Sequence, residues 1–401
     1  MSKVTSIPQL RFPEFSGEWK EKKLSDVAEI VGGGTPPTAV EKYWGGDIQW
    51  FTPTEIKNKY IVNSKRTITQ VGLDTSSARL LPKGTLLFSS RATVGEIGIA
   101  VQECTTNQGF QSFIVNKDND SEFLYNWIIK NKKEFIRRAS GSTFLEIGKS
   151  EIKKIKSNIP LLSEQQKIAA FLTAVDNKIE QLIKKQELLG EYKKGLMQQI
   201  FSQAIRFKAD DGSDFPDWEE KKLGDVAEIV GGGTPPTAVE KYWNGNIQWF
   251  TPTEIKSKFI VNSKRTITQV GLDTSSAKLL PKGTLLFSSR ATVGEVGIAV
   301  QECTTNQGFQ SFIVNKNNEP EFLYNWIIKN KKEFIRRASG STFLEIGKSE
   351  IKKIKLHIPA LPEQTKIANF LSSIDSKIEQ VGKQLDESKQ FKKALLQQMF
   401  I

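Results

Sequence analysis

The stretch "VGGGTPPTAVEKYW" runs from Val31 to Trp44, and it occurs again without a change from Val230 to Trp243. The second copy therefore begins 199 positions after the first (230 − 31). Solenoid and propeller repeats have periods of about 20–50 residues, which is much shorter. The repeat therefore indicates a duplicated domain rather than a repeat array.

The identity extends well beyond these fourteen residues. Trp19–Lys156 aligns with Trp218–Lys355 at the same offset and differs at 11 of 138 positions. The following stretch, Leu161–Phe201 against Ala360–Phe400, differs at 21 of 41 positions. Each copy therefore has a nearly unchanged front part and a more variable tail.

The front part has the pattern of a mixed α/β domain. "TLLFSSRATVGEIGIAV" (85–101) predicts two strands around a glycine-containing turn, and "GFQSFIV" (109–115) predicts another strand. "PEFLYNWIIKNKKEFIRRAS" (320–339) predicts one helix with its apolar face at Phe322, Trp326, Ile327 and Phe334. "GGGTPPT" and "FTPTE" are predicted to be loops because glycine and proline interrupt them. The fold class is therefore α/β (α+β), with about 150 residues in each domain, a common domain size.

The tail has the apolar spacing of a coiled coil. The seam residues alternate in steps of four and three, with Gln186 and Lys193 as polar interruptions of the first tail. They are Ile168, Leu172, Val175, Ile179 and Leu182 in the first tail, and Ile367, Leu371, Ile374, Ile378 and Val381 in the second. Each helix could instead lie on its own domain. Two long heptad helices in one chain favour pairing with each other.

Composition limits the class of protein. The chain has 401 residues and a formal net charge of +12, which suggests a polyanionic partner such as nucleic acid. No apolar run approaches 18 residues, and the first residues lack the pattern of a signal peptide, so no membrane association is expected. Cys104 and Cys303 occupy matching positions, one in each copy, which is no disulfide framework. We expect a cytoplasmic protein.

The residues for most enzyme chemistry are missing. The chain has one histidine, His357, and "GGGTPPT" lacks the GK[ST] ending of a nucleotide-binding loop, although a backbone contact to phosphate stays open. Asp47, Glu55 and Lys57 have the order of a metal-dependent nuclease centre. The second copy has Asn246 in place of Asp47, and an amide is a poor metal ligand, so the nuclease interpretation is disfavoured.

Residues suited to DNA recognition are abundant instead. "FSSRATVG" supplies an arginine that can bond guanine, "TTNQGFQ" supplies asparagine and glutamine that can bond adenine, and "RRASGST" supplies groups for phosphate. The structural alternative is that these side chains cap turns or pack. The DNA-contact candidates of the first copy are Thr35, Thr52, Thr54, Lys57, Ser89, Ser90, Arg91, Thr93, Asn107, Gln108, Arg137, Arg138, Ser142 and Thr143. Those of the second copy are Thr234, Thr251, Thr253, Lys256, Ser288, Ser289, Arg290, Thr292, Asn306, Gln307, Arg336, Arg337, Ser341 and Thr342.

Several of these stretches together resemble the DNA-specificity subunit of Type I restriction–modification systems. They are "RFPEFSGEWKEKKLSDVAEIVGGGTP", "LLFSSRATVGEIGIA", "TTNQGFQSFIV" and "STFLEIGKSEIKKIKSNIPLLSEQQKIAAFL", and the match recurs in the second half. The resemblance implies a subunit without catalytic activity that grips double-stranded DNA and two adenine-N6 methyltransferase subunits, which restriction (translocase) subunits can join. It also implies that S-adenosylmethionine, ATP and Mg²⁺ are bound by those partners, with no cofactor on this chain.

The same resemblance implies how the chain is divided. Target recognition domains are expected at 5–151 and 204–350, and antiparallel conserved helices with a pseudo-two-fold relation at 160–203 and 359–401. Members of the family usually carry two different recognition domains, whereas these two are nearly the same. The chain is therefore expected to read one short sequence twice, as inverted half-sites if the helices are antiparallel and as direct repeats if they are parallel. A stand-alone DNA-binding regulator and the recognition half of a fusion with a separate catalytic part remain alternatives.

Overall fold

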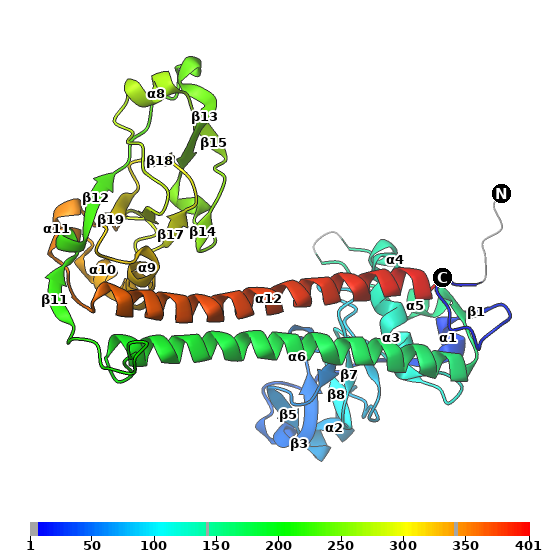
Figure 1. Cartoon of the computed structure of the whole chain (residues 1–401). Coiled ribbons are helices and arrows are strands. Elements are labelled where there is room, and N and C mark those ends of the chain that lie inside the picture. The colour runs from blue at the N-terminus through cyan, green and yellow to red at the C-terminus, as the bar shows by residue number, and fades with distance from the viewer. Residues whose placement is uncertain (1–6, 142–143, 341–343) are drawn as a thin grey trace. The chain divides into compact units, whose positions relative to one another are not determined.

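A computed structural model describes residues 7–141, 144–340 and 344–401 (Figure 1). The chain divides into two compact units. Unit 1 is Met1–Lys184 with Gly382–Ile401, and unit 2 is Lys185–Val381. Each unit thus combines the start of one tail helix with the end of the other.

Unit 1 contains the first copy of the α/β domain. Its strands are β1 (Lys20–Lys23), β2 (Ala28–Gly32), β3 (Trp44–Phe51), β4 (Tyr60–Ile61), β5 (Arg66–Ile68), β6 (Leu86–Phe88), β7 (Ile97–Ala100), β8 (Cys104–Thr106), β9 (Gln111–Val115) and β10 (Lys156–Ile159). Its short helices are α1 (Leu24–Val27), α2 (Gln70–Asp74), α3 (Ser121–Lys130), α4 (Lys132–Arg138) and α5 (Lys149–Lys154), with 3₁₀ turns η1 (Glu41–Tyr43) and η2 (Pro53–Glu55).

Unit 2 repeats this order in the second copy. Its strands are β11 (Glu219–Lys222), β12 (Ala227–Gly231), β13 (Trp243–Phe250), β14 (Phe259–Ile260), β15 (Arg265–Ile267), β16 (Leu285–Phe287), β17 (Val296–Ala299), β18 (Cys303–Thr305), β19 (Gln310–Val314) and β20 (Lys355–Ile358). Its short helices are α7 (Leu223–Val226), α8 (Gln269–Asp273), α9 (Pro320–Lys329), α10 (Lys331–Arg337) and α11 (Lys348–Lys353), with η3 (Glu240–Tyr242) and η4 (Pro252–Glu254).

Each copy contains three sheets within the described residues, and the smallest is a two-stranded sheet, β1-β10 in unit 1 and β11-β20 in unit 2. In unit 2 a five-stranded sheet has the order β12-β19-β16-β17-β14, and a three-stranded sheet has the order β15-β13-β18. β16 and β17 pair antiparallel, with Leu285 opposite Ile298, and β6 pairs with β7 in the same way, so the predicted strand pair is confirmed. The three-stranded sheet and α8 lie at the end of this domain that is away from the long helix α12 (Figure 1).

The predicted single helix at 320–339 is wrong in one respect. Asn330 interrupts it, so that α9 ends at Lys329 and α10 begins at Lys331. The side-chain amide of Asn330 donates to the carbonyl oxygen of Trp326 at 2.8 Å, which competes with the helical bonding of the backbone. The four predicted apolar positions, Phe322, Trp326, Ile327 and Phe334, are nevertheless all buried.

The tails form the long helices α6 (Leu162–Phe201) and α12 (Leu361–Met399), drawn in green and red in Figure 1. In unit 1 the start of α6 packs with the end of α12, where Leu172 shares a core cluster with Leu395 and Met399. In unit 2 the end of α6, at Ile200, shares a cluster with Ile367 and Leu371 near the start of α12. In both units the start of one helix packs against the end of the other, so the helices pair antiparallel, as predicted.

The two interpretations of the tail are both partly correct. The clusters that join the helix ends also contain core residues of the adjacent domain, such as Phe123 in unit 1 and Phe322 in unit 2. The helices therefore pair and also pack on the domains. The ten predicted seam residues are all buried or half-buried.

A buried ion pair attaches each domain to the start of its helix. In unit 2 the guanidinium of Arg206 donates two hydrogen bonds to Glu363 (2.8 and 2.9 Å), and the indole N–H of Trp218 donates a third (3.2 Å). Glu363 is fully buried in the first turn of α12. The equivalent bonds join Arg11 and Trp19 to Glu164 in unit 1. A buried carboxylate with three donors is satisfied, so it fixes this junction.

Candidate DNA-contacting surface

Three loops that are distant in the sequence meet in unit 2. They line a cavity of about 300 Å³, to which they contribute Thr251–Thr253, Arg290–Thr292 and Asn306–Gly308. Each loop belongs to one of the sequence stretches that were predicted to contact DNA. The fold therefore brings three of the predicted stretches into one concave surface, whereas Arg336 and Arg337 of "RRASGST" do not line it.

The sheet topology explains why these loops meet. β13 and β18 pair in parallel, with Phe250 opposite Thr305, so the chain leaves both strands at the same edge. The backbone N–H of Asn306 then donates to the carbonyl oxygen of Phe250 at 3.0 Å. The third loop joins through Ser289, whose backbone N–H donates to the carbonyl oxygen of Gly308 at 2.9 Å.

The arginine of each copy lies at an exposed position in this surface. The side chains of Arg91 and Arg290 are 52% and 51% exposed. The nearest carboxylates, Glu146 and Glu345, are themselves half exposed, with N–O distances of 3.6 and 3.5 Å. Exposed pairs at this distance contribute little to stability. These contacts therefore do not support a structural role in which the arginine holds its domain together through a buried carboxylate.

The residue after each arginine has a strained backbone. Ala92 and Ala291 have φ values of 61° and 63°, in the left-handed region that residues with a Cβ atom rarely adopt. The backbone N–H of Thr292 donates to the carbonyl oxygen of Arg290 at 2.7 Å, closing a three-residue turn around Ala291. Strain of this kind concentrates at functional sites. The sequence gives no signal for it, because alanine is not a residue expected at positive φ.

Two serines of the same stretch do not reach the surface, which corrects part of the predicted set. Ser89 and Ser90 are fully buried, as are Ser288 and Ser289. The hydroxyl of Ser90 donates to the carbonyl oxygen of Gly109 at 3.1 Å, and that of Ser89 bonds the hydroxyl of Thr93 at 2.9 Å. Ser90 therefore joins two loops from the inside, whereas Ser89 braces its own loop. DNA cannot touch either side chain in this conformation.

The asparagine and glutamine have different partners. The side-chain oxygen of Asn107 accepts a bond from the backbone N–H of Gly109 at 2.9 Å, so it holds a turn. Gln108 is exposed, and its side-chain oxygen accepts a 2.5 Å bond from the hydroxyl of Thr35. Thr234 and Gln307 form the same bond in unit 2. Of this pair, the glutamine is the side chain that faces solvent.

The triple glycine is explained by close packing. A Cβ atom on Gly33 would meet the carbonyl oxygen of Asn107 at 2.0 Å. The backbone N–H of Gly34 donates to the carbonyl oxygen of Thr106 at 2.8 Å, so this N–H is not available to a phosphate. Glycine is needed here because two backbone segments touch.

One of the predicted nuclease residues, Glu55, has a structural role. One carboxylate oxygen of Glu55 accepts bonds from the backbone N–H and the hydroxyl of Thr52, both at 2.7 Å, and the other accepts from the backbone N–H of Lys65 at 2.6 Å. Glu55 therefore caps η2. Within the described residues, no group of three or more His, Cys, Asp or Glu side chains could hold a metal ion.

The remaining basic candidates lie outside the cavity lining. Lys57 and Lys256 are exposed, and so are Thr54 and Thr253, of which Thr253 belongs to the cavity lining. Arg137 and Arg138 end α4 and both bond Glu134, which lowers the pKa of that carboxyl, first through the bond from Arg138. Arg336 and Arg337 bond Glu333 in the same way. Ser142, Thr143, Ser341 and Thr342 lie outside the described residues.

The cysteines have no role at this surface. Cys104 and Cys303 are free thiols buried in β8 and β18, and burial raises the pKa of each to about 12.

No helix among the described residues has the length and apolar character needed to cross a membrane.

The fold and the surface define a class of protein. Two copies of one α/β domain each present the same loop surface, and an antiparallel helix pair contributes to the core of both units. The protein family described as the Type I restriction modification DNA specificity domain matches residues 16–189 and 216–388.

Two curated relatives and two solved structures agree with this match. The MjaIX specificity subunit of Methanocaldococcus jannaschii, a Type I restriction enzyme subunit, is 30% identical over 94% of this chain and 92% of its own length. The EcoR124I/EcoR124II specificity subunit of Escherichia coli is 26% identical over 39% of this chain and 41% of its own length. A chain solved in a study of assembly and conformational transition of a type I system superposes with a TM-score of 0.62 at 18% identity, covering 96% of this chain and 97% of that one. The S subunit of M. genitalium superposes with a TM-score of 0.61 at 17% identity, covering 98% and 99%.

This chain belongs to the family of Type I restriction–modification specificity subunits. It is accordingly a DNA-recognition subunit and not itself an enzyme.

Proposed function

We propose that the chain reads a bipartite double-stranded DNA target in which both halves have the same sequence. The observation that carries this proposal is the identity of the two loop surfaces. Thr52–Thr54, Arg91–Thr93 and Asn107–Gly109 recur without a change in the second copy, and none of the 11 differences falls on them. Two identical surfaces select the same bases.

The antiparallel helices support inverted half-sites. An antiparallel helix pair has an approximate two-fold axis perpendicular to the helices, and duplex DNA also has two-fold axes perpendicular to its own. Matching such axes gives a palindromic arrangement of half-sites. A direct repeat would instead need parallel helices. The recognition domains in this proposal are residues 5–151 and 204–350, with helical segments 160–203 and 359–401 between and after them.

The exposed side chains divide into two roles in the proposal. Arg91, Gln108 and Thr54, with their equivalents Arg290, Gln307 and Thr253, contact base edges or the adjacent sugars. Lys57, Arg137 and Arg138, with Lys256, Arg336 and Arg337, contact phosphates. The formal charge of +12 supplies the general attraction to DNA.

The chain also docks two adenine-N6 methyltransferase subunits, and through them restriction subunits. This part of the proposal rests on the family and on the relative structure solved as part of an assembling type I system. S-adenosylmethionine, ATP and Mg²⁺ belong to those partners in this arrangement. Co-purification of a methyltransferase from the native host would support it, and a chain that regulates DNA alone would purify without one.

The test of the target compares half-site arrangements. The methylated motif is first read from the host genome by single-molecule sequencing. The purified chain, with its methyltransferase where one co-purifies, is then bound to duplexes with inverted, direct or single half-sites. The inverted arrangement should bind most tightly. Equal binding to direct and inverted arrangements, or a methylated motif with two different halves, would refute the proposal.

A further inference from the structure

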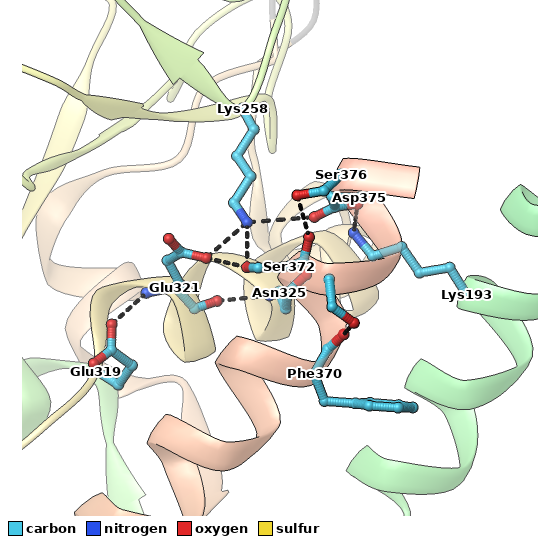
Figure 2. A network of polar contacts seen from close by, with 10 residues as sticks. Lys193, Lys258, Glu319, Glu321, Asn325, Phe370, Ser372, Asp375 and Ser376 are labelled. Carbon is cyan, nitrogen blue, oxygen red and sulfur yellow. Dashed lines mark hydrogen bonds and ion pairs between the residues drawn. The ribbon is translucent and has the colours of Figure 1, made fainter. Parts of the chain in front are cut away.

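A buried polar cluster joins three elements of unit 2 (Figure 2). Lys258 lies at its centre, and its ammonium group contacts Glu321 at 2.7 Å, Ser372 at 2.8 Å and Asp375 at 3.3 Å. Glu321 belongs to α9, whereas Ser372 and Asp375 belong to α12. The lysine therefore connects the recognition domain to the long helix.

The same aspartate also connects the two long helices. The second carboxylate oxygen of Asp375 lies 2.5 Å from the ammonium group of Lys193, which belongs to α6. Figure 2 shows Lys258 and Lys193 approaching Asp375 from different elements. Lys193 is one of the polar residues that interrupt the apolar seam of the tail, and this contact explains its presence there. One carboxylate thus binds the domain and both helices.

The cluster is repeated in unit 1 although the tails have diverged. Lys59 contacts Glu122, Thr173 and Asp176, and Asp176 contacts Lys392. About half of the tail positions differ between the copies, yet Asp176/Asp375 and Lys193/Lys392 are identical, and Thr173/Ser372 keeps a hydroxyl. Because the same cluster joins the domain to the long helices in both units, both units require this attachment.

The lysine side chains of the cluster are largely buried, whereas the carboxylates of Glu321 and Asp375 are partly exposed, at 29% and 27%. The side chains of Lys59 and Lys258 are 7% and 13% exposed. Burial alone would lower the pKa of Lys59, but the bond to Glu122 and the charges of Glu122 and Asp176 outweigh it, so the pKa lies above its usual value. The lysine is therefore charged and held by directional contacts. Buried ionic groups of this kind can fix one geometry among several.

The backbone of Lys258 leads toward the DNA-contacting loop. Its carbonyl oxygen accepts a 2.7 Å bond from the backbone N–H of Ile298 in β17. The loop that contains Arg290 leads directly into β17. A shift of Lys258 relative to α12 would therefore move the strand that supports this arginine.

We propose that Lys258 and Lys59 are positioning residues that set the spacing between half-sites which the protein accepts. This inference rests on the proposed bipartite target. Adding one base pair between half-sites displaces the second by about 3.4 Å and rotates it by about 34°. A domain held in one orientation on its helix discriminates against that change, whereas a loosely held domain tolerates it.

The first test measures the spacing preference of the full chain. Affinity is determined for duplexes whose half-sites are separated by the preferred spacer or by one base pair more or fewer. The Lys258→Met variant should lose about tenfold of this discrimination while its affinity for an isolated half-site stays unchanged. The Ser372→Ala variant, which removes one of three acceptors, should lose less.

Two further variants separate positioning from folding. Lys355→Met removes a lysine with an equally short contact, 2.7 Å to Glu220, but that pair is exposed and lies within the domain, so the spacing preference should not change. Lys258→Met/Glu321→Gln removes the buried pair together and leaves Asp375 with Lys193, which guards against misfolding through an unpaired charge. Unchanged discrimination in both Lys258 variants would overturn the proposal, as would an equal loss of affinity for all duplexes and for isolated half-sites.

A second measurement does not depend on DNA. Spin labels at Asp273→Cys on α8 and Lys377→Cys on α12 report the distance between the recognition domain and its helix within unit 2, and the native thiols are buried. The distance distribution should be narrow in the parent chain and broader in Lys258→Met. An unchanged width would overturn the positioning role whatever the DNA result. A broader distribution in a chain that shows no bipartite DNA preference would refute the proposed target and the spacing role, but not the attachment of the domain.

Discussion

The backbone N–H of Asn107 donates to the carbonyl oxygen of Phe51 at 3.0 Å, and the same bond, also 3.0 Å, joins Asn306 to Phe250 in the second copy. This bond lies where two parallel strands end, and it holds the "FTPTE" loop beside the "TTNQG" loop. The candidate DNA-contacting surface is therefore supported by the ends of paired strands rather than by loop contacts alone. Changes on this surface can be tested without disturbing the sheet beneath it.

The exposed arginines give a prediction with an internal control. Arg91→Ala should weaken discrimination at one half-site by about 1–3 kcal/mol, and Arg290→Ala should do the same at the other. The effects should add in the double variant, because each arginine serves a different half-site. The loss of discrimination is measured as the change in affinity for duplexes in which one or the other half-site is scrambled.

The matched control for the arginines comes from the chain itself. Arg79 is exposed and is replaced by Lys278 in the second copy, so Arg79→Lys should leave binding unchanged. Thermal unfolding should also be nearly unchanged in the Arg91 and Arg290 variants, since their carboxylate contacts are exposed. A large loss of stability would show that the arginine is structural.

The helix seam gives a prediction about stability. Leu172 is fully buried among residues of α12 and the first domain, so Leu172→Asp should place a charge in apolar surroundings at a cost of several kcal/mol. Leu188→Asp on the same helix is the control, because Leu188 is 51% exposed and should tolerate the change. Denaturant unfolding compares the two variants. Equal stability would contradict the antiparallel packing.

Two glycines should respond in opposite directions to the same substitution. Gly33→Ala should destabilise the first domain, since its Cβ atom would lie 2.0 Å from the carbonyl oxygen of Asn107. Gly190→Ala should stabilise the protein by about 0.5–1 kcal/mol, because Gly190 lies within α6 with no neighbour in the way. Melting temperatures of the two variants test this, and a shift of the same sign in both would refute it.

The buried thiols predict a pH dependence of stability. Burial raises the pKa of Cys104 and Cys303 to about 12, above the value near 8.5 of an exposed thiol. The stabilising contribution of the protonated thiols is therefore complete below about pH 8.5 and is lost as the pH rises toward 12. Denaturant unfolding between pH 8 and 11 would show a decline that is smaller in the Cys104→Ala/Cys303→Ala variant. An identical decline in both proteins would contradict this assignment.

The sequence predicted the long helices and the β6–β7 pair because both follow from local spacing. It could not predict that Thr251, Arg290 and Asn306 lie together, since this depends on the parallel pairing of β13 with β18 and on a sheet order that skips along the chain. It also placed Ser89 and Ser90 on the surface, because a serine beside an exposed arginine looks polar and accessible. Ser90 bonds a carbonyl oxygen from another loop, at Gly109, which no local pattern reveals.

An aromatic contact between distant parts of the sequence has a consequence for how the protein is made. The rings of Phe123 and Phe400 lie 5.1 Å apart in the core of unit 1, although the two residues are 277 positions apart in the sequence (400 − 123). At a synthesis rate of about 5–20 residues per second, Phe400 is added roughly 14–55 s after Phe123. During this time an apolar face around Phe123 and Leu172 lacks its final partner. The nascent chain thus offers chaperones a binding surface that disappears only when the end of α12 arrives.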